Sequence, residues 1–190
     1  MVVGRFEPKA AKVGSLRDSL AVGLDEALTA LEESFHDLTD EQAWARPCAE
    51  RHTITTMVMH VHQNADVHVC QLQMGKLVLE HDWRRFDIWR DPDPDRPDRQ
   101  EGLPTVAEML ERHRAVAAAA KAGLEAASEE DLLGPRMAAG TDWVDKHGRN
   151  AAEGYARVIW HIMAHVRQIW LLRGIMGLTD KDGWPEQHYH

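Results

Sequence analysis

Apolar residues recur every three or four positions in four segments of the chain, which is the spacing of one face of an α-helix. The first segment predicts a helix from about Ala10 to His36. Its apolar residues are Leu20, Leu24, Leu28, Leu31, Phe35 and Leu38. Thr39 and Gln42 have the spacing of a capping box, which indicates a further short helical turn, and Pro47 then prevents a continuous helix.

Two further segments continue the helical pattern. One predicts a helix that begins near Thr53 and ends near Gly75. Its apolar face consists of Ile54, Val58, Val61, Ala65, Val69 and Leu72. The other begins at a capping box formed by Thr105 and Glu108 and stops before Gly134. Its apolar residues are Met109, Leu110, Val116, Ala120 and Leu124.

The last segment, from Ala151 to about Ile175, is apolar on almost every side, which predicts a helix buried on most sides. Asn150 stands three residues before Glu153 and indicates the start of this helix, and Gly174 and Gly177 are natural terminators. No segment alternates with the period of a β-strand. We therefore expect an all-α protein built as a four-helix bundle.

A long stretch rich in proline and aspartate separates the second and third helices. From His81 to Gly102 the helical pattern is absent, and the prolines there favour a loop because they lack a backbone donor. Loops of this length act as lids or binding loops, or are disordered. Trp83 and Trp89 favour packing of the first half of the loop against the bundle, because disordered segments contain few aromatic residues.

The composition is that of one soluble globular domain: 190 residues, of which 44% are hydrophobic and 28% charged. We expect a single domain over 1–190, with its core over about 10–177. No apolar run is long enough to cross a membrane, no secretory signal is present, and Cys48 and Cys70 form no CxxC pair, so we expect a cytoplasmic protein. A net charge of -9 without a basic cluster argues against nucleic acid as a partner.

Histidine is unusually frequent, with 12 residues in the chain. His161 and His165 are four residues apart and share one face of the fourth helix, where two imidazoles can bind one metal ion. Chance alone produces about 0.8 such pairs in this composition, so the spacing by itself is weak evidence. A buried imidazole needs a partner, because an unpaired polar group costs about 1–3 kcal/mol. The sequence leaves two such partners open: a metal ion, or hydrogen-bonding groups within the core.

A third ligand would come from the second helix, which carries His60, His62 and His68. At about 100° per residue, His68 lies about 40° from the centre of the apolar face, His62 about 80° and His60 about 120°. Periodicity therefore does not select His60. A ligand at that position would lie on the flank of the face, where the second helix would have to meet the fourth.

Other catalytic sites fit the sequence less well. A carboxylate-bridged di-iron bundle needs paired Glu-x-x-His motifs, and only Glu33 and His36 have that spacing. The chain contains no HExxH, GxSxG, P-loop or GxGxxG motif. Cys70 stands close to His68 in the sequence, but we expect it to be a buried structural cysteine rather than a nucleophile.

Three stretches of the chain resemble the DinB-like, or YfiT-like, superfamily of four-helix metalloproteins. LTDEQAWARP resembles the turn between the first two helices of the family, and ITTMVMH places a histidine six residues after an isoleucine, as its second helix does. HIMAHVRQIWLLRG resembles the family signature of two histidines four apart, then a glutamine, an apolar stretch and an arginine. These matches span most of Leu16 to Gly177, and the last one is the specific one.

The resemblance implies that His60, His161 and His165 bind a divalent metal ion (zinc, nickel or iron) and that Gln168 has a structural role. It also implies metal-dependent chemistry, since several members transfer a low-molecular-weight thiol to an electrophile. Three neutral imidazoles would leave the full charge of the ion and an open coordination position. Such an ion deprotonates a coordinated thiol, or lowers the pKa of bound water to about 7.

We therefore expect a metal-dependent thiol transferase or a related hydrolase that acts on a small-molecule substrate, with a low-molecular-weight thiol as co-substrate. The alternative is a non-catalytic binding or scaffold bundle whose histidines are structural. The apolar fourth helix and the 7 tryptophans further predict a homodimer, and we expect no membrane partner.

Overall fold

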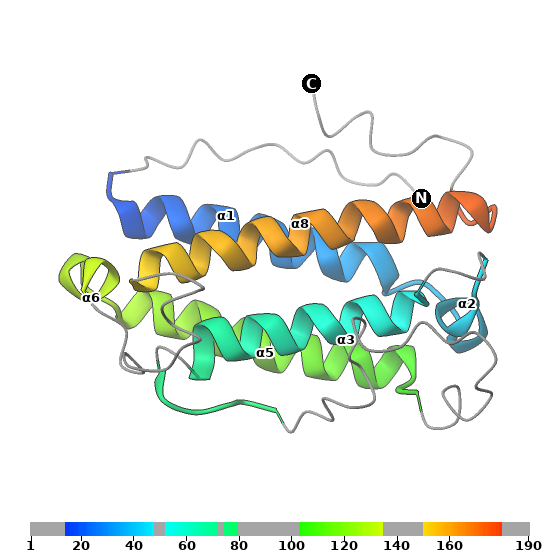
Figure 1. Ribbon diagram of the computed structural model, residues 1–190, viewed down its shortest axis with the longest axis horizontal. Coiled ribbons are helices and arrows are strands. Elements are labelled where there is room, and N and C mark those ends of the chain that lie inside the picture. The colour runs from blue at the N-terminus through cyan, green and yellow to red at the C-terminus, as the bar shows by residue number, and fades with distance from the viewer. Residues whose placement is uncertain (1–13, 48–51, 72–73, 80–102, 135–149, 180–190) are drawn as a thin grey trace.

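Four long helices pack side by side in the computed structural model, which describes residues 14–47, 52–71, 74–79, 103–134 and 150–179. They are α1 (Leu16–Phe35), α3 (Ile54–Ala65), α5 (Val106–Ala126) and α8 (Ala151–Ile175). Figure 1 shows that α1 and α8 run in one direction and that α3 and α5 run in the other. Each of α1 and α3 packs against both α5 and α8, so α1 lies diagonally opposite α3. The predicted all-α bundle is confirmed.

Side-chain caps begin these helices where the sequence predicts them. Thr39 and Gln42 form a capping box at the start of α2 (Asp40–Trp44), and Thr105 and Glu108 form another at the start of α5. Asn150 caps α8 by accepting a hydrogen bond from the backbone N–H of Glu153. Each cap satisfies a backbone donor that the first helical turn leaves without a partner.

The first helix begins later than the predicted start near Ala10. Ser15 has an extended backbone, with φ -146° and ψ 165°, and its side chain accepts a hydrogen bond from the N–H of Asp18. The helix therefore starts at Leu16. The Pro-rich loop predicted from His81 to Gly102, with Trp83 and Trp89, lies outside the described residues.

The third predicted helix is two helices, so its predicted continuation to Gly134 is wrong. The helix α5 ends at Ala126, and the next residue, Ala127, has an extended ψ of 134°. Ser128 then begins α6 (Glu129–Leu133) with a capping box that it shares with Asp131. A serine followed three residues later by an acid is a start signal, and here it outweighs the helix propensity of the flanking alanines.

The second predicted helix changes its winding in the middle. After α3 the chain continues as a π-helical segment, η1 (Asp66–Gln71), in which Asp66, His68 and Cys70 are buried. The Asp66 carboxylate accepts hydrogen bonds of 2.9 Å from the backbone N–H groups of both Val78 and Leu79. This contact ties the end of the helix to the segment that follows it.

The core consists of the inward faces of the long helices, but α8 is not buried on most sides as predicted. Trp160, Leu171 and Ile175 on α8 are 71%, 62% and 51% exposed. The apolar residues of α8 therefore form two groups, one packed in the core and one exposed on the surface. None of the described helices has the length and hydropathy needed to span a membrane.

Candidate metal centre

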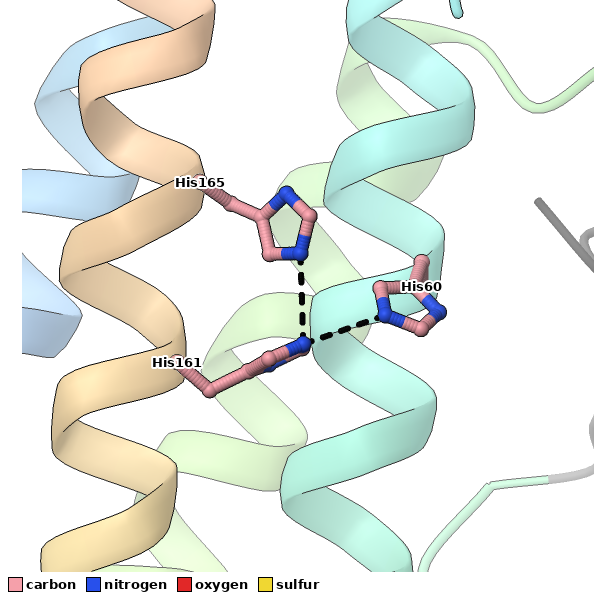
Figure 2. A group of neighbouring side chains, drawn as sticks. All are labelled: His60, His161 and His165. Atoms are coloured by element: carbon pink, nitrogen blue, oxygen red, sulfur yellow. Dashed lines mark hydrogen bonds between the residues drawn. The ribbon is translucent and has the colours of Figure 1, made fainter. Parts of the chain in front are cut away.

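Three histidines from two helices meet at one point where α3 packs against α8. Figure 2 shows His161 and His165 pointing from α8 toward His60 on α3. The Nε2 atom of His161 lies 3.1 Å from Nε2 of His60 and 3.2 Å from Nε2 of His165. One ligand atom from each residue lies within 4.8 Å of the other two. We call this group the three-histidine centre.

The helix geometry explains why these side chains converge. His161 and His165 are one turn apart on α8, so both project from the same face. The ring centroid of His60 lies 4.9 Å from that of His161 and 5.2 Å from that of His165. Because α3 packs against α8, the flank of α3 that carries His60 faces the pair. All three side chains are half-buried.

Burial keeps the histidines of α8 neutral. It lowers the pKa of His161 to about 3, with further lowering by the neighbouring His165 and His60. Burial also lowers the pKa of His165, and the neighbouring Gln168 side chain opposes this effect. A neutral imidazole offers a nitrogen lone pair, which is the form that a metal ion requires.

The spacing of the nitrogen atoms suits a small divalent ion. In a tetrahedral zinc site with Zn–N bonds of about 2.0–2.1 Å, two nitrogen ligands lie about 3.3 Å apart. The two measured Nε2 separations, 3.1 Å and 3.2 Å, are close to this value. The donor set is therefore compatible with a divalent metal bound by three histidines.

The other two histidines of the second predicted helix lie elsewhere. His62 is 1% exposed and points into the bundle, where its ring centroid lies 6.5 Å from that of Phe35 and 5.3 Å from that of His113. His68 is fully buried within η1. Of the three candidates, the structure brings only His60 into hydrogen-bond distance of His161.

Cys70 is unsuited to act as a nucleophile at neutral pH. Its side chain is fully buried, and burial together with the adjacent Asp66 raises the pKa of the thiol to about 12. The thiolate is the reactive form of cysteine. Cys70 therefore fits the structural role expected from the sequence.

Two polar residues that the hydrophobic pattern does not single out flank the three-histidine centre. Asn64 follows His60 by four residues on α3, and Arg157 precedes His161 by four residues on α8. The signal that could have found them is this spacing of one helical turn from a candidate ligand.

Comparison with protein families gives an independent result. The family model of the DinB superfamily matches residues 24–169, a range that includes α3, α5 and all three histidines of the centre. No curated protein in the comparison matches the chain. Both family membership and the three-histidine centre fit metal binding. The match covers well over half of the chain, and the protein belongs to the DinB superfamily.

Proposed function

We propose that the protein is a metal-dependent enzyme that transfers a low-molecular-weight thiol to a small electrophilic substrate, or a hydrolase that uses the same centre. The observation that carries this proposal is the convergence of His60, His161 and His165. The Nε2 atom of His161 lies 3.1 Å from that of His60 and 3.2 Å from that of His165. These residues would hold zinc, nickel or iron. When bound, the ion would supply the positive charge that makes a thiol or a water molecule acidic at neutral pH.

The protein's own residues would set the conditions for this chemistry. Burial lowers the pKa values of both His161 and His165, which keeps their rings neutral. In the transferase reaction the thiol gives its proton to the solvent, and its sulfur forms a bond to the electrophilic carbon. The bond from that carbon to the leaving group breaks, and the leaving group takes the electron pair.

The half-buried position of the centre favours a small substrate. The three side chains lie where α3 packs against α8 and are half-buried, so they are not sealed in the core. A low-molecular-weight thiol stays reduced in the cytoplasm, which is therefore the location that we propose for the protein.

The reaction of 2-mercaptoethanol with iodoacetamide tests this function. We expect the metal-loaded protein to accelerate iodide release near pH 7, and the variants H161A and H165A to lose the acceleration. H36A is the matched control, because His36 is an exposed histidine at the end of α1 and lies outside the centre.

Two results would change the proposal. Metal-loaded protein that accelerates only the hydrolysis of an activated ester would favour the hydrolase. Metal-loaded protein that accelerates neither reaction would contradict catalysis and favour a non-catalytic bundle with structural histidines.

A further inference from the structure

The three-histidine centre continues into a polar pair one helical turn away. Asn64 is one turn after His60 on α3, and Arg157 is one turn before His161 on α8. Residues four apart lie on the same face of a helix. Since α3 and α8 run in opposite directions (Figure 1), both steps lead the same way along the helix pair. Asn64 and Arg157 therefore flank the same end of the centre.

One polar atom of Asn64 lacks a partner among the described residues. Its side-chain oxygen is buried, and it has no hydrogen-bond partner in the described part of the chain. Buried amide groups are normally paired, and an exception calls for an explanation such as a ligand. The amide can turn over to present either its oxygen or its N–H groups, so it can donate to a bound molecule.

Arg157 is an exposed cation that has no counter-ion among the described residues. None of the ion pairs among the described residues includes it. Arg157 stands one helical turn from His161 and is exposed, so its guanidinium group remains available to a ligand.

Arg157 is the arginine of α8 that stands one turn from His161. Arg167 projects from a different face of the helix, and Arg173, near the C-terminal end of α8, is paired with Asp37. An exposed positive charge attracts small anions and raises their concentration near it.

We propose that Arg157 and Asn64 bind a carboxylate group of the substrate, so that the ligand of the centre is a small carboxylate-bearing molecule whose other end reaches the histidines. This inference rests on the function proposed above. The guanidinium group can donate two parallel hydrogen bonds to a carboxylate, and the Asn64 amide can add a third.

Two thiols of matched size test the proposal on the full-length protein loaded with zinc: 3-mercaptopropionate, which carries a carboxylate, and 3-mercapto-1-propanol, which is neutral. Isothermal titration calorimetry at one fixed ionic strength gives the Kd of each. We expect the wild-type protein to bind the anionic thiol at least about tenfold more tightly, as one charge-assisted contact provides.

Substitutions of Arg157 and Asn64 test whether these two residues cause the preference for the anionic thiol. R157Q is expected to bring the ratio of the two Kd values close to one, with the Kd of the neutral thiol and the zinc content unchanged. N64A is expected to reduce the ratio by a smaller factor, about threefold. R167Q is the matched control, because it removes the same charge from a different face of α8 and should keep the preference.

The outcomes separate this inference from the function on which it rests. A protein that takes up no zinc, or that binds neither thiol, overturns the proposed function together with the inference. A protein that binds both thiols equally, or an R157Q variant that keeps the preference, overturns the carboxylate site alone.

Discussion

His113 and His62 are buried side by side between α1, α3 and α5. The ring of His113 lies 6.2 Å from Phe35 and 5.3 Å from His62, measured between centroids, and its Nε2 atom is 3.8 Å from a carboxylate oxygen of Glu32. Burial lowers the pKa of His113 to about 4, and the attraction of Glu32 opposes this only in part. The folded protein therefore keeps this histidine neutral in mild acid.

We predict that His113 makes the fold sensitive to acid. Its pKa is about 6.5 in the unfolded chain and about 4 in the folded one, so between these values the unfolded chain binds the additional proton. The free energy of unfolding should therefore fall as the pH decreases through this window, by at most ~1.4 kcal/mol per pH unit for this group. Urea unfolding of the metal-free protein at about pH 7 and about pH 5 measures the effect.

The variant H113Q isolates the contribution of this residue. The lowered pKa values of His161 and His165 also contribute to the pH dependence, but they do so in both proteins. We expect a weaker pH dependence of unfolding in H113Q than in the wild type. The same dependence in both would contradict a buried neutral His113.

At the residue scale, sequence narrowed the candidate ligands but could not choose among those of the second helix. His161 and His165 could be paired from their spacing, because both lie on one helix. The choice between His60 and His62 depends on which neighbouring helix faces each flank of α3, and periodicity contains no such information. His62, closer to the apolar face, points into the core, and His60, farther from it, faces α8.

Among the elements, α1 and α8 are joined at their C-terminal ends by one buried arginine. Arg173 on α8 is 5% exposed, and its two terminal nitrogens donate to the two carboxylate oxygens of Asp37 at 2.6 Å and 2.8 Å. It also donates to the backbone oxygen of Ser34 and stacks on the ring of Trp170 at 4.6 Å. This planar, forked set of contacts matches a guanidinium group and not an ammonium group.

We predict that R173K destabilises the protein by about 2 kcal/mol, although it keeps the charge, because lysine cannot make the forked contact with Asp37 and leaves the Ser34 oxygen without its donor. Thermal and urea unfolding measure the loss. R167K is the control, since Arg167 is exposed on the same helix. Equal stability of R173K and the wild type would show that the forked contact has no structural role.

The starts of the helices could be predicted more accurately than their interruptions. Capping residues such as Thr105 and Asn150 act locally, so their effect is visible in a few residues of sequence. The π-helical winding of η1 was not predicted, because its apolar spacing continues that of α3. Its buried Asp66 is satisfied by Val78 and Leu79, and such a contact across a turn has no signature in hydrophobic periodicity.

At the scale of the whole molecule, the bundle leaves large apolar side chains of α8 in contact with solvent. Trp160 and Leu171 are more than half exposed, as is Ile175 at the end of the helix. Large exposed apolar side chains are enriched where proteins associate. The exposed apolar side chains of α8 therefore support the prediction of a homodimer.

We predict that light scattering of the purified protein gives a mass of twice the 21.5 kDa of the chain. L171E should shift the mass toward that of the monomer, because it places a charge in the proposed contact. The same substitution should leave the helical circular dichroism unchanged, because Leu171 does not belong to the core. A monomeric mass for the wild type at working concentration would refute self-association.

The bundle as a whole serves to hold two antiparallel helices so that His60 meets His161 and His165. Elemental analysis of freshly purified protein tests this central claim most directly. The predicted result is about one divalent metal ion per chain in the wild type, and loss of that ion in H161A. Wild-type protein that stays free of metal after incubation with zinc, nickel and iron salts would contradict it.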